Sequence, residues 1–173
     1  MDRVASYSPE DVVVVISQKS TGLVWQVSGY MEDSNINFER ESEGWMKHVG
    51  IDNNTTLVHK ANTSGSLTLS LAQSSSSNYV FQNLYDYHDR VRSVDGLFTV
   101  MVKDTTGLSI IFSDNCWIGK MPNQQFGSSV QGREWVIDMA ATKNTVGGNM
   151  KFTPEEVANI EKLGGTVAAE WRI

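Results

Sequence analysis

Hydrophobic and polar residues alternate strictly over residues 66–71. Three leucines alternate there with three hydroxyl residues, in the order Ser66, Leu67, Thr68, Leu69, Ser70 and Leu71. Because successive side chains of an extended segment point to opposite faces, the leucines share one face and the hydroxyl residues share the other. This stretch predicts a β-strand with one face in the core and one polar face.

A helix is predicted directly after this strand. The serines at 74–77 are candidate N-caps. Five residues then recur at helical spacing: Val80, Phe81, Leu84, Tyr85 and His88. The first four of these form a stripe that predicts packing of the helix in the core.

Further strands are predicted where the alternation returns or where a short Val/Ile run is typical of a buried strand. They cover residues 11–19, 23–28, 35–41, 97–103, 108–113, 116–121 and 130–141. The connection at 104–107 predicts a β-hairpin, and residues 1–9 predict a flexible arm. The polar residues 44–56 predict a long loop or a protruding hairpin, with 56–60 as its returning arm.

A second helix is predicted beyond a glycine hinge at 147–148. Thr153 is a candidate N-cap, Pro154 suits the first helical position, and Glu156 completes a capping box. A narrow apolar stripe and a glycine stop follow, formed by Val157, Ile160, Leu163, Gly164 and Gly165. Residues 166–173 predict a short strand or an arm anchored by Trp171.

Together these elements predict a mainly β fold: a β-sandwich or barrel over residues 1–143 with one flanking helix, and a C-terminal extension over 144–173 with an added helix at about 154–163. A chain of 173 residues suits one domain with a sizeable core. No apolar run is long enough to cross a membrane or form a signal peptide, so we expect no membrane insertion and a chain made in the cytoplasm.

The net charge of −6 argues against a protein that binds nucleic acid tightly, because affinity for nucleic acid comes mainly from Lys and Arg. The acidic residues are unevenly spread. Five of them fall within twelve residues, opposed there only by Arg40: Glu32, Asp33, Glu39, Glu41 and Glu43.

The sequence carries no sign of a catalytic, metal or cofactor site. Cys116 is the only cysteine, no nucleophile or phosphate-binding motif is present, and the three histidines, at 48, 59 and 88, are dispersed. Glu39 with Glu41, and Glu134 with Asp138, share a strand face. Either pair is a candidate acid/base pair, but a solvated polar face is the favoured interpretation. The tryptophans at 25, 45, 117, 135 and 171 are candidate sugar platforms, with packing favoured.

With these residues in view, the chain resembles the tail tube proteins of contractile-tailed bacteriophages. The matching segments are YSPEDVVVVIS, GWMKHVGIDNNTTLVHKANTSGSLTLSLAQSSSSN and LFTVMVKDTTGLSIIFSDNCWIGKMPNQQFGSSVQGREWVI, and the resemblance covers about residues 7–141. The chain departs from the family pattern at Ser76, where a proline is expected, and in the tail from about residue 144.

The resemblance implies a β-sandwich or barrel flanked by a helix, with strands of neighbouring subunits joined into an inner β-barrel. It implies six-membered rings that stack into a hollow tube through which DNA passes without specific binding. The partners it implies are copies of the chain, a tail sheath protein, a tape-measure protein, and baseplate and neck proteins. The protein would be assembled in the host cytoplasm and reside in the virion tail.

Two sets of residues follow from this hypothesis. The candidates for the lumen wall are Glu39, Glu41, Ser66, Thr68 and Ser70. The candidates for contacts between rings are Trp45, Lys47, His48, Asp52, Asn53, Asn54 and Lys60. Three alternatives stay open at this point: the tube of a secretion or extracellular contractile injection machine that carries protein, a carbohydrate-binding β-sandwich, and a glycosidase that uses the glutamate pairs.

Overall fold

Antiparallel strands form one eight-stranded sheet in the computed structural model, which describes residues 3–32 and 36–173. They are β1 (Val12–Gln18), β2 (Leu23–Gln26), β3 (Ile36–Arg40), β6 (Gly65–Ala72), β7 (Phe98–Asp104), β8 (Ile110–Lys120), β9 (Gly132–Met139) and β10 (Lys143–Thr145). The order is β2-β1-β7-β8-β9-β6-β3, with β10 paired to β8. The predicted mainly β fold is confirmed. Met1, Asp2, Asp33 and Asn35, which belong to predicted segments, lie outside the described residues.

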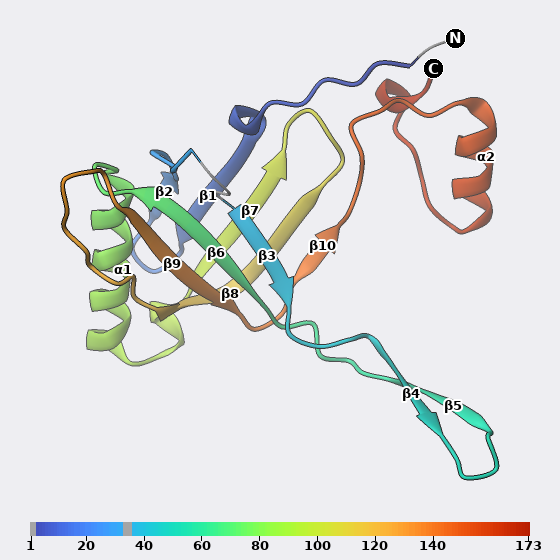
Figure 1. The fold of residues 1–173 in the computed structure, drawn as a ribbon, viewed down its shortest axis with the longest axis horizontal. Helices are drawn as coiled ribbons and strands as arrows, with labels where there is room; N and C mark the ends of the chain where they lie inside the picture. Colours follow the sequence, from blue (N-terminus) through green and yellow to red (C-terminus); the bar gives the residue numbers. More distant parts are fainter. Residues whose placement is uncertain (1–2, 33–35) are drawn as a thin grey trace.

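The sheet folds over so that its two halves enclose the core. Figure 1 shows β3, β6 and β9 crossing in front of β1, β7 and β8. Leu67, Leu69 and Leu71 are fully buried, as their alternation predicts. Side chains of the other strands complete the core, among them Val14, Ile16, Val100, Cys116, Trp135, Ile137 and Met139. Burial raises the pKa of the Cys116 thiol to about 11, so this thiol is inert at neutral pH.

Strand β8 corrects one prediction. Residues 108–113 and 116–121 were expected to form two strands, but a single strand runs through both. Phe98 pairs with Cys116 and Val100 pairs with Ser113, so β8 holds one extra residue there. This β-bulge places Asp114 and Asn115 side by side at the surface. In the sequence, two adjacent polar residues of these types resemble a turn between two strands. The bulge bends β8 where the two halves of the sheet meet.

Helix α1 (Ser77–Val91) lies along one side of the sandwich (Figure 1). Phe81 and Leu84 are buried, and the Phe81 ring lies 5.3 Å from the ring of Trp135, centroid to centroid. Val80 packs against the core from a half-buried position. The prediction that Tyr85 belongs to the core is wrong, because its side chain is 37% exposed at the edge of the stripe.

The serine run both caps α1 and anchors it. As one of the predicted caps, Ser75 accepts a hydrogen bond at its hydroxyl from the Ser77 N–H at 3.2 Å. Ser76 occupies the N-cap position, but its backbone is helical and its side chain makes no cap bond. The buried Ser77 hydroxyl instead accepts hydrogen bonds from Trp25 Nε1 and the Ser28 N–H, each at 3.1 Å. The start of the helix is therefore tied to β2 and the segment that follows it.

Truncation of Phe81 tests the role of α1 in the core. Phe81→Ala should lower the free energy of unfolding by about 3–5 kcal/mol, because it leaves a cavity against Trp135. Tyr79→Ala on the same helix is the matched control, since Tyr79 is 75% exposed and should change stability by less than about 0.5 kcal/mol. Urea unfolding of both variants measures the difference. Equal losses would show that α1 is not part of the core.

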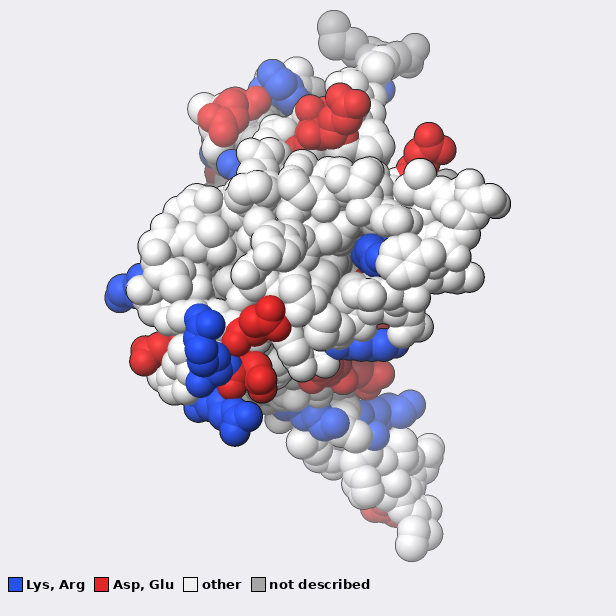
Figure 2. Space-filling model, turned by 90° about the vertical axis from the view of Figure 1, so that its left-hand side faces the viewer, with Lys and Arg blue, Asp and Glu red and all other residues white. Residues whose placement is uncertain are grey.

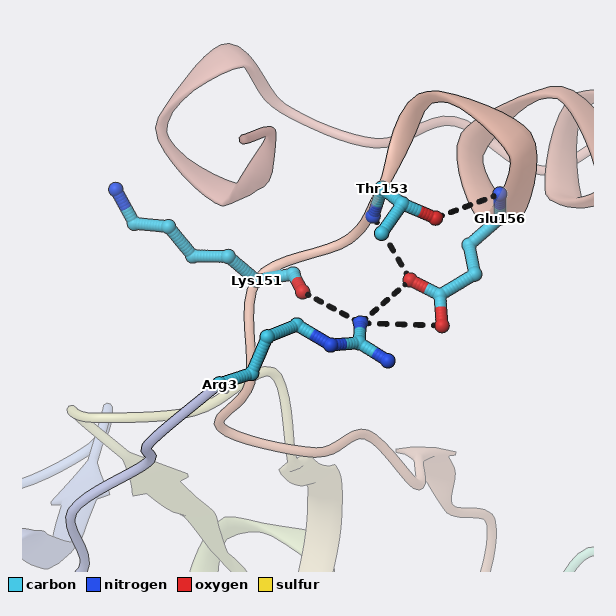
Figure 3. Close-up of polar contacts among 4 residues, drawn as sticks. All are labelled: Arg3, Lys151, Thr153 and Glu156. Atoms are coloured by element: carbon cyan, nitrogen blue, oxygen red, sulfur yellow. Dashed lines mark hydrogen bonds and ion pairs between the residues drawn. The ribbon is translucent and has the colours of Figure 1, made fainter. Parts of the chain in front are cut away.

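The C-terminal extension holds helix α2 (Pro154–Lys162), and the N-terminal arm lies against its start. The predicted capping box is confirmed: the Thr153 hydroxyl accepts from the Glu156 N–H at 3.3 Å, and the Glu156 carboxylate accepts from the Thr153 N–H at 2.8 Å. Figure 3 shows Arg3 Nη1 reaching both carboxylate oxygens of Glu156, at 3.1 and 2.8 Å, and the Lys151 carbonyl at 3.3 Å. We call this group of four residues the terminal clasp.

The apolar stripe of α2 is narrower than predicted. Val157 is buried, but Leu163 is 90% exposed because α2 ends at Lys162 and the chain turns at Gly164. The final residues form a 3₁₀ turn (Ala169–Trp171). The predicted boundary between 143 and 144 falls inside β10, and the division into two parts stays a prediction. Within the described ranges, neither α1 nor α2 is long and apolar enough to span a membrane.

We expect the terminal clasp to make the attachment of the N-terminal arm to the start of α2 sensitive to acid. Arg3 first, and then the Thr153 N–H, hold the pKa of Glu156 at about 2, against an ordinary value of 4.5. Because the folded pKa is lowered, the contribution of this carboxylate is complete above pH 4.5 and is lost as pH falls through about 2. NMR titration of the Glu156 carboxyl carbon should show this midpoint, and Arg3→Ala should move it toward 4.5. An identical midpoint in both proteins would mean that Arg3 does not hold Glu156.

Candidate functional site

The outward side of β3, β6 and β9 forms a polar surface that we call the hydroxyl-acid face. It consists of Asn37, Glu39, Ser66, Thr68, Ser70, Glu134, Val136 and Asp138, which alternate with core residues along the three strands. Ser66 pairs with Glu39 on one side and with Asp138 on the other. Thr68 pairs in the same way with Asn37 and Val136. All five predicted lumen residues thus lie on this face or at its end.

Carboxylates gather at the end of this face where β3 finishes. Glu39 is exposed, and Glu41 lies just beyond β3, where it accepts a hydrogen bond from the Ser64 hydroxyl at 2.8 Å. Burial, and then the charge of Glu41, raise the pKa of Asp138. The sequence placed Glu134 and Asp138 on one strand face but did not join them to Glu39. The alternation over 130–141 shows which residues share a face of this strand. It does not show that the strand lies near Glu39, which depends on the strand order.

Residues 44–60 form a two-stranded hairpin of β4 (Trp45–Val49) and β5 (Thr55–His59) that projects from the body (Figure 1). Its tip is closed by a bond from the Gly50 N–H to the Asn54 carbonyl at 2.8 Å. Asn53 has a left-handed backbone, with φ of 64°. The Asp52 carboxylate accepts bonds from the main-chain and side-chain N–H groups of Asn54. The protruding hairpin that the sequence offered as one of two options is thus confirmed.

Every residue of β4 and β5 is exposed, although many are apolar. The exposed apolar side chains are Trp45, Met46, Val49, Ile51, Leu57 and Val58, with Ile51 at the tip fully accessible. Figure 2 shows the outer part of the projection as largely uncharged, while charged groups gather near its base. An isolated hairpin is marginally stable in water, and apolar groups gathered in this way mark an interaction surface.

A cavity of about 480 Å³ opens at the opposite end of the sandwich from the hairpin. The hairpin follows the last residue of β3, whereas the cavity lies where β1, β3 and β8 begin and β7 ends. Its apolar lining includes Val12, Ile36, Phe38, Val102, Ile110 and Ile111, and two carboxylates, Glu32 and Asp104, also line it.

One polar group in the cavity wall is unsatisfied. The Tyr30 hydroxyl is buried and finds no hydrogen-bond partner within residues 3–32 and 36–173. Burial accordingly raises the pKa of Tyr30. A buried hydroxyl without a partner is costly, so it marks a place where a further acceptor would be favourable.

The other candidate chemistry is not assembled. Across the described ranges, no three His, Cys, Asp or Glu side chains are placed to hold a metal ion. Trp45 is 61% exposed, but Trp25, Trp117 and Trp171 are half-buried and Trp135 is buried. A platform for sugars would therefore have one freely exposed indole. Glu39 and Glu41 lie on the open face rather than in the cavity.

Comparisons with known proteins agree with this architecture. "Structural protein ORF10" of Pseudomonas phage KPP10 is 35% identical over 169 residues, which cover 98% of each chain, so the C-terminal extension is shared with that relative. A chain from the virion of a native gene transfer agent particle matches the fold with a TM-score of 0.52 and 12% identity, covering 82% of this chain and all of that one.

A chain of the anti-feeding prophage cap, described as a tube terminating cap, is also similar, with a TM-score of 0.49, 12% identity, and coverage of 84% of this chain and 96% of that chain. The family model described as "Bacteriophage PhiTE tail tube protein" matches residues 4–147. That match spans most of the sandwich and the hairpin, and the KPP10 relative matches over nearly the full length. The chain therefore belongs to the PhiTE family of bacteriophage tail tube proteins.

Proposed function

We propose that this tail tube protein forms six-membered rings that stack into a hollow tube, through which DNA passes from the capsid to the host. The observation that carries the proposal is the hydroxyl-acid face on a chain of the tail tube family. Small hydroxyl groups and carboxylates suit a wall along which DNA slides, because negative charge repels phosphates. The role is structural, with no catalytic step.

Ring closure would use the two edges of the sheet. In the described part of the chain, β2 and β3 are each paired on one side only. Open edges of this kind tend to pair with other chains, and closure around a ring removes them. Strands of neighbouring subunits would thereby join into one inner barrel, with Glu39, Glu41, Ser66, Thr68 and Ser70 turned to the lumen.

Stacking would use the hairpin. Its exposed apolar side chains need a partner surface, and contacts that repeat head to tail generate open helical assemblies. We place Trp45, Lys47, His48, Asp52, Asn53, Asn54 and Lys60 at the contact with the adjacent ring. The outer wall would meet a sheath protein, and the tube ends would meet baseplate and neck proteins, with a tape-measure protein in the lumen during assembly in the host cytoplasm.

Electron microscopy of the purified protein tests this function. We expect rings or tubes with a central hole, and image averaging should give sixfold symmetry. Monomers that persist at every protein concentration and in the presence of a tail initiation complex would contradict the proposal.

A further inference from the structure

We propose that the hairpin tip of one subunit, led by Ile51, inserts into the cavity beside Tyr30 of a second copy in the next ring. The inference rests on the proposed stacking of rings, and it names the surface that receives the hairpin. It joins two features: an apolar tip in solvent, and an apolar cavity in which the Tyr30 hydroxyl has no hydrogen-bond partner among residues 3–32 and 36–173.

The positions of the two features suit a head-to-tail contact. The cavity lies where β3 begins, and the hairpin leaves the body where β3 ends. A copy displaced along this direction therefore brings its hairpin toward the cavity end of its neighbour. The ten residues from Glu41 to Gly50 span up to about 33 Å when extended, so the tip reaches well beyond its own subunit.

The chemistry of the two surfaces is complementary. The side chain of Ile51 is fully accessible, and the cavity of about 480 Å³ has room for a branched side chain and part of its turn. The Tyr30 O–H donates to no acceptor in the described part of the chain, and a turn exposes backbone carbonyls that accept such bonds.

The charges agree with this arrangement. Glu32 and Asp104 line the cavity, whereas β4 carries Lys47 four residues before the tip. With Ile51 inside the cavity, the long side chain of Lys47 reaches the mouth, where opposite charges favour the correct partner and register. The one acid at the tip, Asp52, already accepts bonds from Asn54.

Three single substitutions test the contact through the lowest protein concentration at which tubes form. Ile51→Ala should raise it about tenfold, because less apolar surface is buried. Tyr30→Phe should raise it about threefold to tenfold if the hydroxyl is paired in the tube. Val94→Ala is the control and should have no effect, since Val94 is 78% exposed and belongs neither to the hairpin nor to the cavity lining. Unchanged assembly by Ile51→Ala and Tyr30→Phe would overturn the proposal.

Cross-linking gives an independent answer. The native thiol of Cys116 is buried, so a short bis-maleimide should react only with introduced cysteines. Tubes of Ile51→Cys with Glu32→Cys should give a ladder of covalent multimers on denaturing gels, whereas each single variant, and Ile51→Cys with Val94→Cys, should not. Tubes without a ladder, or with the same ladder from the control pair, would overturn the contact while leaving the tube intact. A wild-type protein that forms no tubes contradicts the proposed function itself and removes the basis of this inference.

Discussion

Deletion of residues 44–60 should leave rings that do not stack into tubes. The deletion removes all six exposed apolar side chains of the hairpin. Burying even one or two such side chains contributes about 1.5–3 kcal/mol each, so the concentration needed for stacking should rise roughly a hundredfold or more. Sedimentation and electron microscopy measure this directly, as rings or smaller species in place of tubes.

The fold should tolerate this deletion. The Glu41 N–H already bonds to the Ser64 carbonyl at 3.2 Å. The residues left between them, at 42, 43 and 61–63, form a five-residue connection of a length common in β-hairpins. An unchanged urea midpoint is the control for folding. Normal-length tubes from the deleted chain would rule out the hairpin as the contact between rings.

Charge reversal on the hydroxyl-acid face should stall DNA ejection in virions that look normal. On the proposed lining of the tube by Glu39 and Glu41, Glu39→Lys with Glu41→Lys would replace repulsion of phosphates by attraction at every subunit. Each lysine would then neutralise a phosphate along the DNA path, so ejection should slow by roughly tenfold or more. Release of DNA triggered in vitro and followed with a DNA-binding dye measures the rate.

Neutral and salt controls separate this effect from damage to the tube. Glu39→Gln with Glu41→Gln keeps the size of the side chains without the charge, and it should slow ejection less. Added salt should restore the rate of the lysine variant, because screening weakens contacts with phosphates. Ejection at the wild-type rate by intact lysine-variant particles would exclude these residues from the DNA path.

The individual elements could be predicted from local pattern to a large extent. The alternation of Leu67, Leu69 and Leu71 gave the correct buried face, and Thr153 with Glu156 gave the correct helix start. The alternation and the capping box each involve only a few neighbouring residues, so both can be recognised in the sequence alone. The bulge at Asp114 was misread because two adjacent exposed polar residues resemble a turn.

The surfaces depended on information that the local pattern does not contain. Glu39 and Asp138 share one face only because β6 lies between β3 and β9. The cavity beside Tyr30 is built from the ends of β1, β3 and the β7–β8 hairpin, which are far apart in the chain. Among the serines expected as caps of α1, Ser75 does cap the helix. The local pattern could not show that the Ser77 hydroxyl accepts a hydrogen bond from Trp25, because packing across the sandwich sets that contact.

The strand order also has a consequence for the speed of folding. It pairs Val14 with Val102 and Leu69 with Trp135, so the core closes only after distant parts of the chain meet. Sheets dominated by such pairings fold in about milliseconds to seconds. During this time the strand edges and the apolar hairpin are open to other chains, and aggregation competes with folding. Rapid synthesis of many copies therefore favours aggregation, because more partly folded chains are present together.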